Sequence, residues 1–249
     1  MKEITGNFKV GKDNFSTFFN KICIQNPQLF QHKVIEANCD YFLENLKLWS
    51  PKPTLTLSEC VAVLMIVYNE TGGKFIPISE QGSKEYIETA TATKLAYSYK
   101  ERGRGYIQIT WESAYSIVLD ALNLKKYEDY TSEELDELFL KNKKASFGAL
   151  RVFFSHPRLK KYSFDKLAQN DFKTFGTAIS GGGAYVPLYV NRVNFVLDKL
   201  KNENLATSTP FYKQTWFWIA ILVIFAVCLW LYRDLVFKSY KTAIAEIKN

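Results

Sequence analysis

Histidine and cysteine are scarce in this chain of 249 residues, which has two histidines and four cysteines. The cysteines form no C-x-x-C pair and the histidines form no H-E-x-x-H motif, so zinc sites and histidine-centred catalysis lack their usual components. The cysteine spacing is also unlike that of a disulfide framework. We therefore expect no metal and no cofactor, and carboxylate chemistry remains as the candidate.

Glycine and proline are also few, with 12 and 7 residues, while 47% of the chain is hydrophobic and 23% is charged. This composition excludes disordered, collagen-like and low-complexity chains. The net charge of +7 suits contact with anionic lipid headgroups, cell-wall polymers or nucleic acid, although such an excess can also serve only to keep a surface solvated. The lysines are scattered and no basic run with interleaved aromatics is present, so we expect no nucleic-acid partner.

One long apolar run stands near the end of the sequence. Residues 215–232, TWFWIAILVIFAVCLWLY, contain no charged residue, glycine or proline. As a helix they are about 27 Å long, enough to cross the hydrocarbon core of a bilayer. Trp216 and Trp230 lie near its two ends, as in the aromatic belts of membrane proteins. The run predicts a transmembrane helix and a lipid membrane as partner, and a buried core helix is the alternative.

The chain is expected to divide once, before this run. Residues 202–210, NENLATSTP, are polar and aperiodic, as in a linker. We predict a domain over 1–203, a linker over 204–214, the membrane helix over 215–232 and a short basic tail over 233–249. The N-terminal stretch MKEITGNFKVGKDNF lacks the apolar region of a secretory signal. The expected location is therefore a membrane, with a single C-terminal anchor.

Apolar residues in the first domain recur mostly with helical spacing, which predicts a mainly α fold with short β segments. The stretches with this pattern are 15–23, 30–48, 57–69, 113–122, 132–139, 145–154, 164–170, 172–179 and 186–200. The helix over 57–69 is the best defined, because Thr56 and Glu59 form a capping box and residues 60–67 are apolar on every face. It is expected to be the buried centre of the domain and to end near Gly72.

This helix delivers a carboxylate, Glu70, at its C-terminal end. The helix dipole and the loss of solvation both raise the pKa of a carboxyl group there, which suits a general acid. Glu80 follows on a polar loop that favours the ionised form. Two carboxylates in contrasting environments are what hydrolysis of a glycosidic bond requires, although two such glutamates are more often surface charges.

The segment GRGYIQITW (103–111) places two glycines before a short predicted extended run over 106–110. In an extended chain Gln108 and Thr110 share one face, and Ile107 and Ile109 share the other. The isoleucine face can then pack in the core while the polar face meets a substrate.

Together, these motifs resemble the family 19 glycoside hydrolases, which include chitinases and cell-wall lysins of phages and bacteria. The matching motifs, in the order of the family, are NETGG (69–73), EQ (80–81), GRGYIQITW (103–111), ISGG (179–182) and NRV (191–193). The resemblance implies a lysozyme-like helical hydrolase. It also implies that Glu70 is the general acid, that Glu80 is the base that activates water for inversion, and that Thr110 holds this water.

The resemblance further implies a substrate hydrogen bond from Gln108 and support of the acid and base by Arg192. Ser180 stands where the family has a substrate-binding asparagine, and its shorter side chain lacks the paired donor and acceptor of an amide. Further departures from the family pattern are Asn69 for histidine, Tyr106 for proline and Arg102 for an aromatic residue. Arg192 can equally be a structural arginine, and we expect Trp111 to be a packed aromatic rather than a sugar platform.

The predicted function is that of a membrane-anchored enzyme cleaving β-1,4 bonds of peptidoglycan by inversion. The alternatives are a chitinase acting on another N-acetylated β-1,4 glycan and a catalytically silent wall-binding membrane protein. A wall-cutting domain on a C-terminal anchor suits the membrane of a phage particle used in cell entry, with other virion proteins as partners. A bacterial inner-membrane protein is the alternative location.

Overall fold

The computed structural model describes residues 9–45, 55–94, 97–156, 171–180, 183 and 185–203. The chain divides into two compact units, Met1–Ala206 and Thr207–Asn249, and every described residue belongs to the first. The predicted linker, membrane helix, basic tail and helix 164–170 lie outside the described residues. Within the described ranges, no helix has both the length and the apolar character needed to cross a membrane.

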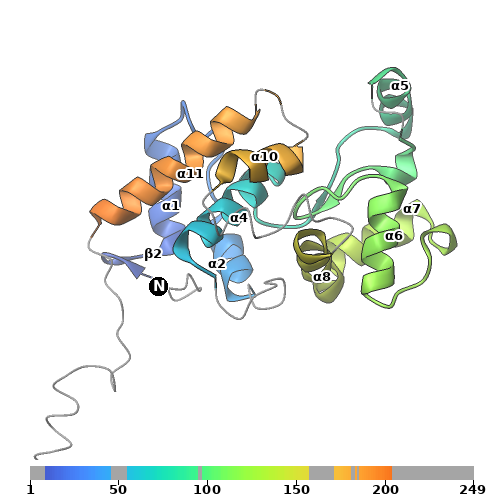
Figure 1. Ribbon diagram of the computed structural model, residues 1–249, viewed down its shortest axis with the longest axis horizontal. Helices are drawn as coiled ribbons and strands as arrows, with labels where there is room; N and C mark the ends of the chain where they lie inside the picture. The colour runs from blue at the N-terminus through green and yellow to red at the C-terminus, as the bar shows by residue number, and fades with distance from the viewer. Residues whose placement is uncertain are drawn as a thin grey trace, which may run out of the picture. The chain divides into compact units, whose positions relative to one another are not determined.

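The described domain is mainly α, with short β segments, as predicted (Figure 1). Its α-helices are α1 (Phe15–Gln25), α2 (Glu36–Glu44), α4 (Leu57–Glu70), α5 (Lys84–Lys94), α6 (Glu112–Ala121), α7 (Ser132–Asp136), α8 (Lys143–Ser155), α10 (Phe172–Ser180) and α11 (Tyr185–Asn202). The strands form two antiparallel pairs, β1 (Lys9–Val10) with β2 (Asp13–Asn14) and β3 (Ile78–Ser79) with β4 (Arg104–Gly105). The predicted helix over 132–139 is split between α7 and a π-helical turn, Glu137–Lys141.

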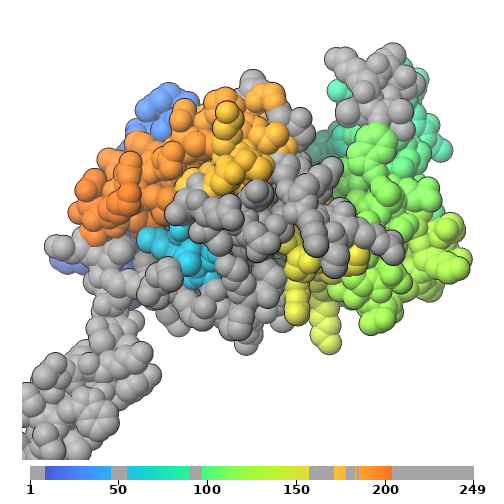
Figure 2. Space-filling model, in the orientation of Figure 1, coloured from blue at the N-terminus to red at the C-terminus, as the bar shows by residue number. Residues whose placement is uncertain are grey.

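Helix α4 is the buried centre of the domain, as its sequence predicts. Thr56 and Glu59 form the expected capping box, and the side chains from Glu59 to Tyr68 are buried. Helix α11 packs against both α4 and α10, and the opposite side of α11 lies on the surface (Figure 2). The Tyr189 hydroxyl of α11 donates a hydrogen bond to the Ala62 carbonyl of α4, 3.2 Å away. The helix that ends in Glu70 is therefore fixed from all sides.

The predicted helix over 30–48 is wrong in its first turns, since α2 begins only at Glu36. The hydroxyl of Tyr68 accepts a hydrogen bond from the His32 N–H at 2.9 Å and donates one to the His32 carbonyl at 2.7 Å. The Val34 N–H is taken by the Asn20 side chain. A backbone whose polar groups are bound to distant side chains has none left for a helix.

The predicted extended run over 106–110 is also wrong, because these residues turn back on themselves. The Arg104 N–H donates to the Ile109 carbonyl and the Ile109 N–H donates to the Arg104 carbonyl, at 3.2 and 2.9 Å. Gln108 takes a φ of 52° within this turn, and Gly105 a φ of 85°. Even so, the isoleucines at 107 and 109 are buried and the polar residues between and after them are partly exposed.

Candidate active site

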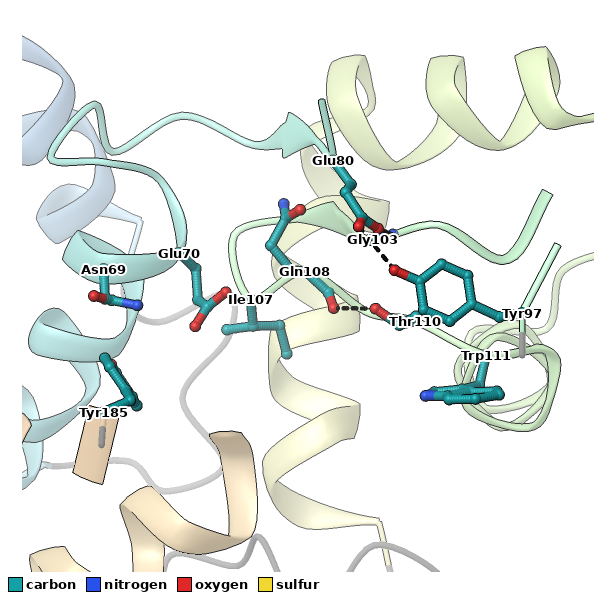
Figure 3. Close-up of a pocket in the computed structure, with 10 residues that line it drawn as sticks. All are labelled: Asn69, Glu70, Glu80, Tyr97, Gly103, Ile107, Gln108, Thr110, Trp111 and Tyr185. Carbon is teal, nitrogen blue, oxygen red and sulfur yellow. Dashed lines mark hydrogen bonds between the residues drawn. The ribbon is translucent and has the colours of Figure 1, made fainter. Parts of the chain in front are cut away.

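A pocket of about 460 Å³ brings the two predicted catalytic glutamates together (Figure 3). Its lining residues are Asn69, Glu70, Glu80, Tyr97, Gly103, Ile107, Gln108, Thr110, Trp111 and Tyr185. Glu70 and Glu80 reach into it from opposite sides. Ser180 ends α10, but its side chain lies outside the described part of the chain, and Arg192 lies behind the lining.

Glu70 is the last residue of α4 and is only partly exposed. Burial raises the pKa of its carboxyl group, and a hydrogen bond with the Asn69 side chain opposes this effect. The C-terminal end of a helix also disfavours a negative charge. A carboxylic acid that keeps its proton toward neutral pH is suited to general-acid catalysis.

Glu80 is held by one hydrogen bond to each carboxylate oxygen. The Tyr97 hydroxyl donates to Oε1 at 2.8 Å, and the Gly103 N–H donates to Oε2 at 3.0 Å. The Glu80 N–H in turn donates to the Gly103 carbonyl at 2.8 Å. Burial, followed by the bond to Glu80, raises the pKa of the Tyr97 hydroxyl, so this group stays a donor. This role of Tyr97 was not predicted, because no short sequence motif links it to Glu80.

Thr110 and Gln108 both line the pocket, and their donors are engaged within the protein. The Thr110 hydroxyl donates to the Gln108 carbonyl at 2.9 Å, so toward a water molecule it is an acceptor. The Gln108 amide nitrogen donates to the carbonyls of Ile78, at 2.9 Å, and Gly105, at 3.1 Å. The side-chain oxygen of Gln108 therefore remains available to accept a hydrogen bond from a ligand.

Arg192 is buried on α11 and makes its described hydrogen bonds to oxygens that carry no full charge. Its Nε donates to the Leu29 carbonyl at 2.5 Å, and Nη1 donates to Asn69 Oδ1 at 3.2 Å. Since the Asn69 side chain also bonds Glu70, the described link from Arg192 to the acid runs through an amide. Asn69, which departs from the family pattern, therefore connects Arg192 to Glu70 through its side-chain amide.

Arg104, whose role no sequence motif indicated, anchors the hairpin that carries Ile107 and Gln108 into the pocket. Its side chain is fully buried, and its Nε pairs with Asp136 Oδ1 at 2.5 Å. Arg102 pairs with the other oxygen of Asp136 at 2.5 Å and donates to the Ser79 hydroxyl at 2.9 Å. One carboxylate of α7 therefore holds both arginines of the segment that positions Glu80.

The expectation that Trp111 is a packed aromatic is wrong. Its side chain is 42% exposed, and it lines the pocket beside Thr110. The Tyr97 ring meets it edge to face at 5.3 Å between centroids. Trp111 also has a φ of 76°, a conformation that costs energy in a non-glycine residue and is found mostly where a site requires it.

Comparison with known proteins supports the fold. No family model matches the chain, and no curated protein matches it significantly. A crystal structure of a chitinase C mutant is 19% identical with a TM-score of 0.50, covering 72% of this chain and 91% of that one. Chitinase C from Streptomyces griseus HUT6037 is 17% identical with a TM-score of 0.46, covering 72% and 75%. The first similarity confirms the chitinase-like fold that the motifs imply.

Proposed function

We propose that the chain is a glycoside hydrolase that cleaves β-1,4 bonds of an N-acetylated glycan with inversion. The observation that carries this proposal is the contrast between two carboxyl groups in one pocket. Burial raises the pKa of Glu70, whereas Glu80 accepts a hydrogen bond at each oxygen. An acid and a base on opposite sides of a pocket are the requirement for acid-base hydrolysis of a glycoside.

In the proposed reaction, Glu70 gives its proton to the glycosidic oxygen as the bond from this oxygen to the anomeric carbon breaks. A water molecule adds to the anomeric carbon from the opposite face and gives one proton to Glu80. Thr110 accepts a hydrogen bond from this water, which directs its lone pair toward the sugar. One water is consumed for each bond cleaved, and the configuration of the sugar is inverted.

Peptidoglycan is the proposed substrate, because a protein with a net charge of +7 is attracted to the anionic polymers of a cell wall. Chitin is the second candidate, because the structure with the supporting fold similarity is a chitinase C. Trp111 offers an exposed ring at the pocket for a sugar face in either case. Digestion of purified sacculi and of chitin oligomers separates the two substrates.

The test of catalysis is Glu70→Gln, which keeps the shape of the side chain but has no proton to transfer. We expect glycan cleavage to fall by at least about 10²-fold, the lower range for general-acid catalysis. The matched control is Glu128→Gln, at an exposed position away from the pocket lining. NMR detection of the first anomer released tests inversion. Activity of Glu70→Gln within tenfold of the parent contradicts the proposal, and an inactive parent supports the silent wall-binding alternative.

We also propose that residues 215–232 anchor the enzyme in a membrane, that of a phage particle acting during cell entry. The support is the uncharged apolar run with tryptophans near both ends. Mass spectrometry of purified particles before and after detergent treatment is the test. Release only by detergent supports the anchor, while absence from particles and recovery in bacterial inner membranes supports the alternative location.

A further inference from the structure

Tyr185 has a buried hydroxyl that has no role in the reaction as proposed above. It is the first residue of α11 and lines the active-site pocket. Its hydroxyl oxygen is shielded from solvent and has no hydrogen-bond partner in the structure as described. A buried hydroxyl without a partner is uncommon in a folded protein and calls for a physical explanation.

The ionisable groups around this hydroxyl come from two packed helices. Glu70 of α4 and Arg192 of α11 both act on it electrostatically, and Tyr189 lies one turn further along α11. Lys173, the ionisable residue of α10, is exposed, and Glu80 lies across the pocket. Figure 3 draws Tyr185 beside Asn69 and Glu70, on the same side of the pocket.

Tyr185 stays protonated throughout the working range of a glycosidase. Burial raises the pKa of its hydroxyl, the charge of Glu70 raises it further, and Arg192 opposes this effect. Among the residues that the structure describes, this group is therefore a hydrogen-bond donor without an acceptor. While Glu70 holds its own proton, the acid has less need of a donor, and the Asn69 side chain already supplies one.

We propose that Tyr185 is a positioning residue whose hydroxyl donates a hydrogen bond to the Glu70 carboxylate once this acid has passed its proton to the leaving sugar. This inference rests on the proposed function. The proton on the glycosidic oxygen comes from Glu70 alone, and Tyr185 keeps its own. Because the new hydrogen bond forms only as negative charge develops on Glu70, it stabilises the transition state more than the bound substrate.

Tyr185→Phe tests this role, since it removes the hydroxyl and keeps the ring. We expect kcat to fall by about 10- to 100-fold, the effect of one hydrogen bond to a charged group, with KM within about twofold of the parent. Loss of a donor to the ionised form raises the pKa of Glu70 further, so the alkaline limb of the pH profile of kcat/KM moves to higher pH.

The matched control is Tyr189→Phe, which removes another buried tyrosine hydroxyl from α11. Its hydroxyl donates to the Ala62 carbonyl in the core. This variant is expected to lose stability but to keep the alkaline limb of the parent. The proposal is overturned if Tyr185→Phe keeps the parental kcat and the parental alkaline limb of the pH profile. It is also overturned if both variants lose kcat equally and the alkaline limb moves in neither.

A second measurement does not depend on glycan cleavage. Carbon NMR titration of the full chain in detergent, with the Glu70 signal assigned through Glu70→Gln, gives the pKa of Glu70 directly. We expect it to be higher in Tyr185→Phe, and lower when 3-fluorotyrosine, a stronger donor, stands at position 185. Unchanged titration overturns the role of Tyr185 even if hydrolysis is observed. Shifted titration in a chain that cleaves no glycan supports the contact and overturns the proposed function alone.

Discussion

Glu80 differs from Glu70 in how it is held. Burial at a helix end raises the pKa of Glu70, whereas a hydroxyl and a backbone N–H fix the orientation of the Glu80 carboxylate. The first environment can be inferred from neighbouring sequence, because the helix and its end are local features. The second cannot, because Tyr97 and Gly103 approach Glu80 only through folding.

At the residue scale, we expect Tyr97→Phe to lower kcat by about tenfold, because a base held at one oxygen instead of two samples unproductive orientations. KM should change little, since the ring that meets Trp111 remains. Steady-state kinetics on one soluble glycan measures both constants.

The control is Tyr99→Phe, nearby in sequence, whose ring stacks on the Arg102 guanidinium at 3.8 Å. It should retain the parental kcat. A kcat for Tyr97→Phe equal to that of Tyr99→Phe would show that the hydroxyl contact with Glu80 has no part in the reaction.

At the element scale, helix α4 and the hairpin around Gly105 differ in how far sequence determines them. A capping box and a continuous apolar run specify α4 within a single stretch. The hairpin depends on Arg104 and on Asp136 of α7, which lies far along the chain. Helix α5 was not predicted, because KEYIETATATK has no regular apolar spacing.

Substitutions at two glycines in and next to the hairpin, Gly103 and Gly105, form a matched test of how Gln108 is placed. A Cβ at Gly103 would lie 2.8 Å from Gln108 Oε1 and 3.2 Å from Gln108 Cβ, whereas a Cβ at Gly105 has nothing within 4 Å. Gly103→Ala should displace Gln108 from the carbonyls it binds and lower activity at least tenfold, with most of the thermal stability retained.

Gly105→Ala meets only the cost of its positive φ, about 1–2 kcal/mol, and should lose stability rather than activity. Melting curves and glycan cleavage by both variants provide the measurement. Equal activity in the two variants would mean that the placement of Gln108 does not matter to the site.

At the scale of the whole molecule, the raised pKa of Glu70 links stability to pH. A carboxyl group whose pKa is higher in the folded than in the unfolded chain binds its proton more tightly when folded. Its favourable contribution is complete below the ordinary carboxyl pKa of 4.5 and is lost as the pH rises through the folded value.

Glu70→Gln should therefore melt at a higher temperature than the parent at pH 7 and at a similar temperature at pH 4. Calorimetry of both chains at the two pH values, with Glu128→Gln as the exposed control, measures the difference. A parent that is as stable as Glu70→Gln at pH 7 would show that ionising this acid costs the fold nothing.

The two glutamates are held with unequal firmness, and heat should therefore affect them differently. Glu70 ends α4, which is buried along most of its length, while Glu80 depends on a short hairpin, one tyrosine hydroxyl and the arginines that share Asp136. Small segments held by a few polar contacts open at lower free energy than a core helix does. Warming should first misalign the base against a still rigid acid, so that reversible inactivation sets in several degrees below the melting of the domain.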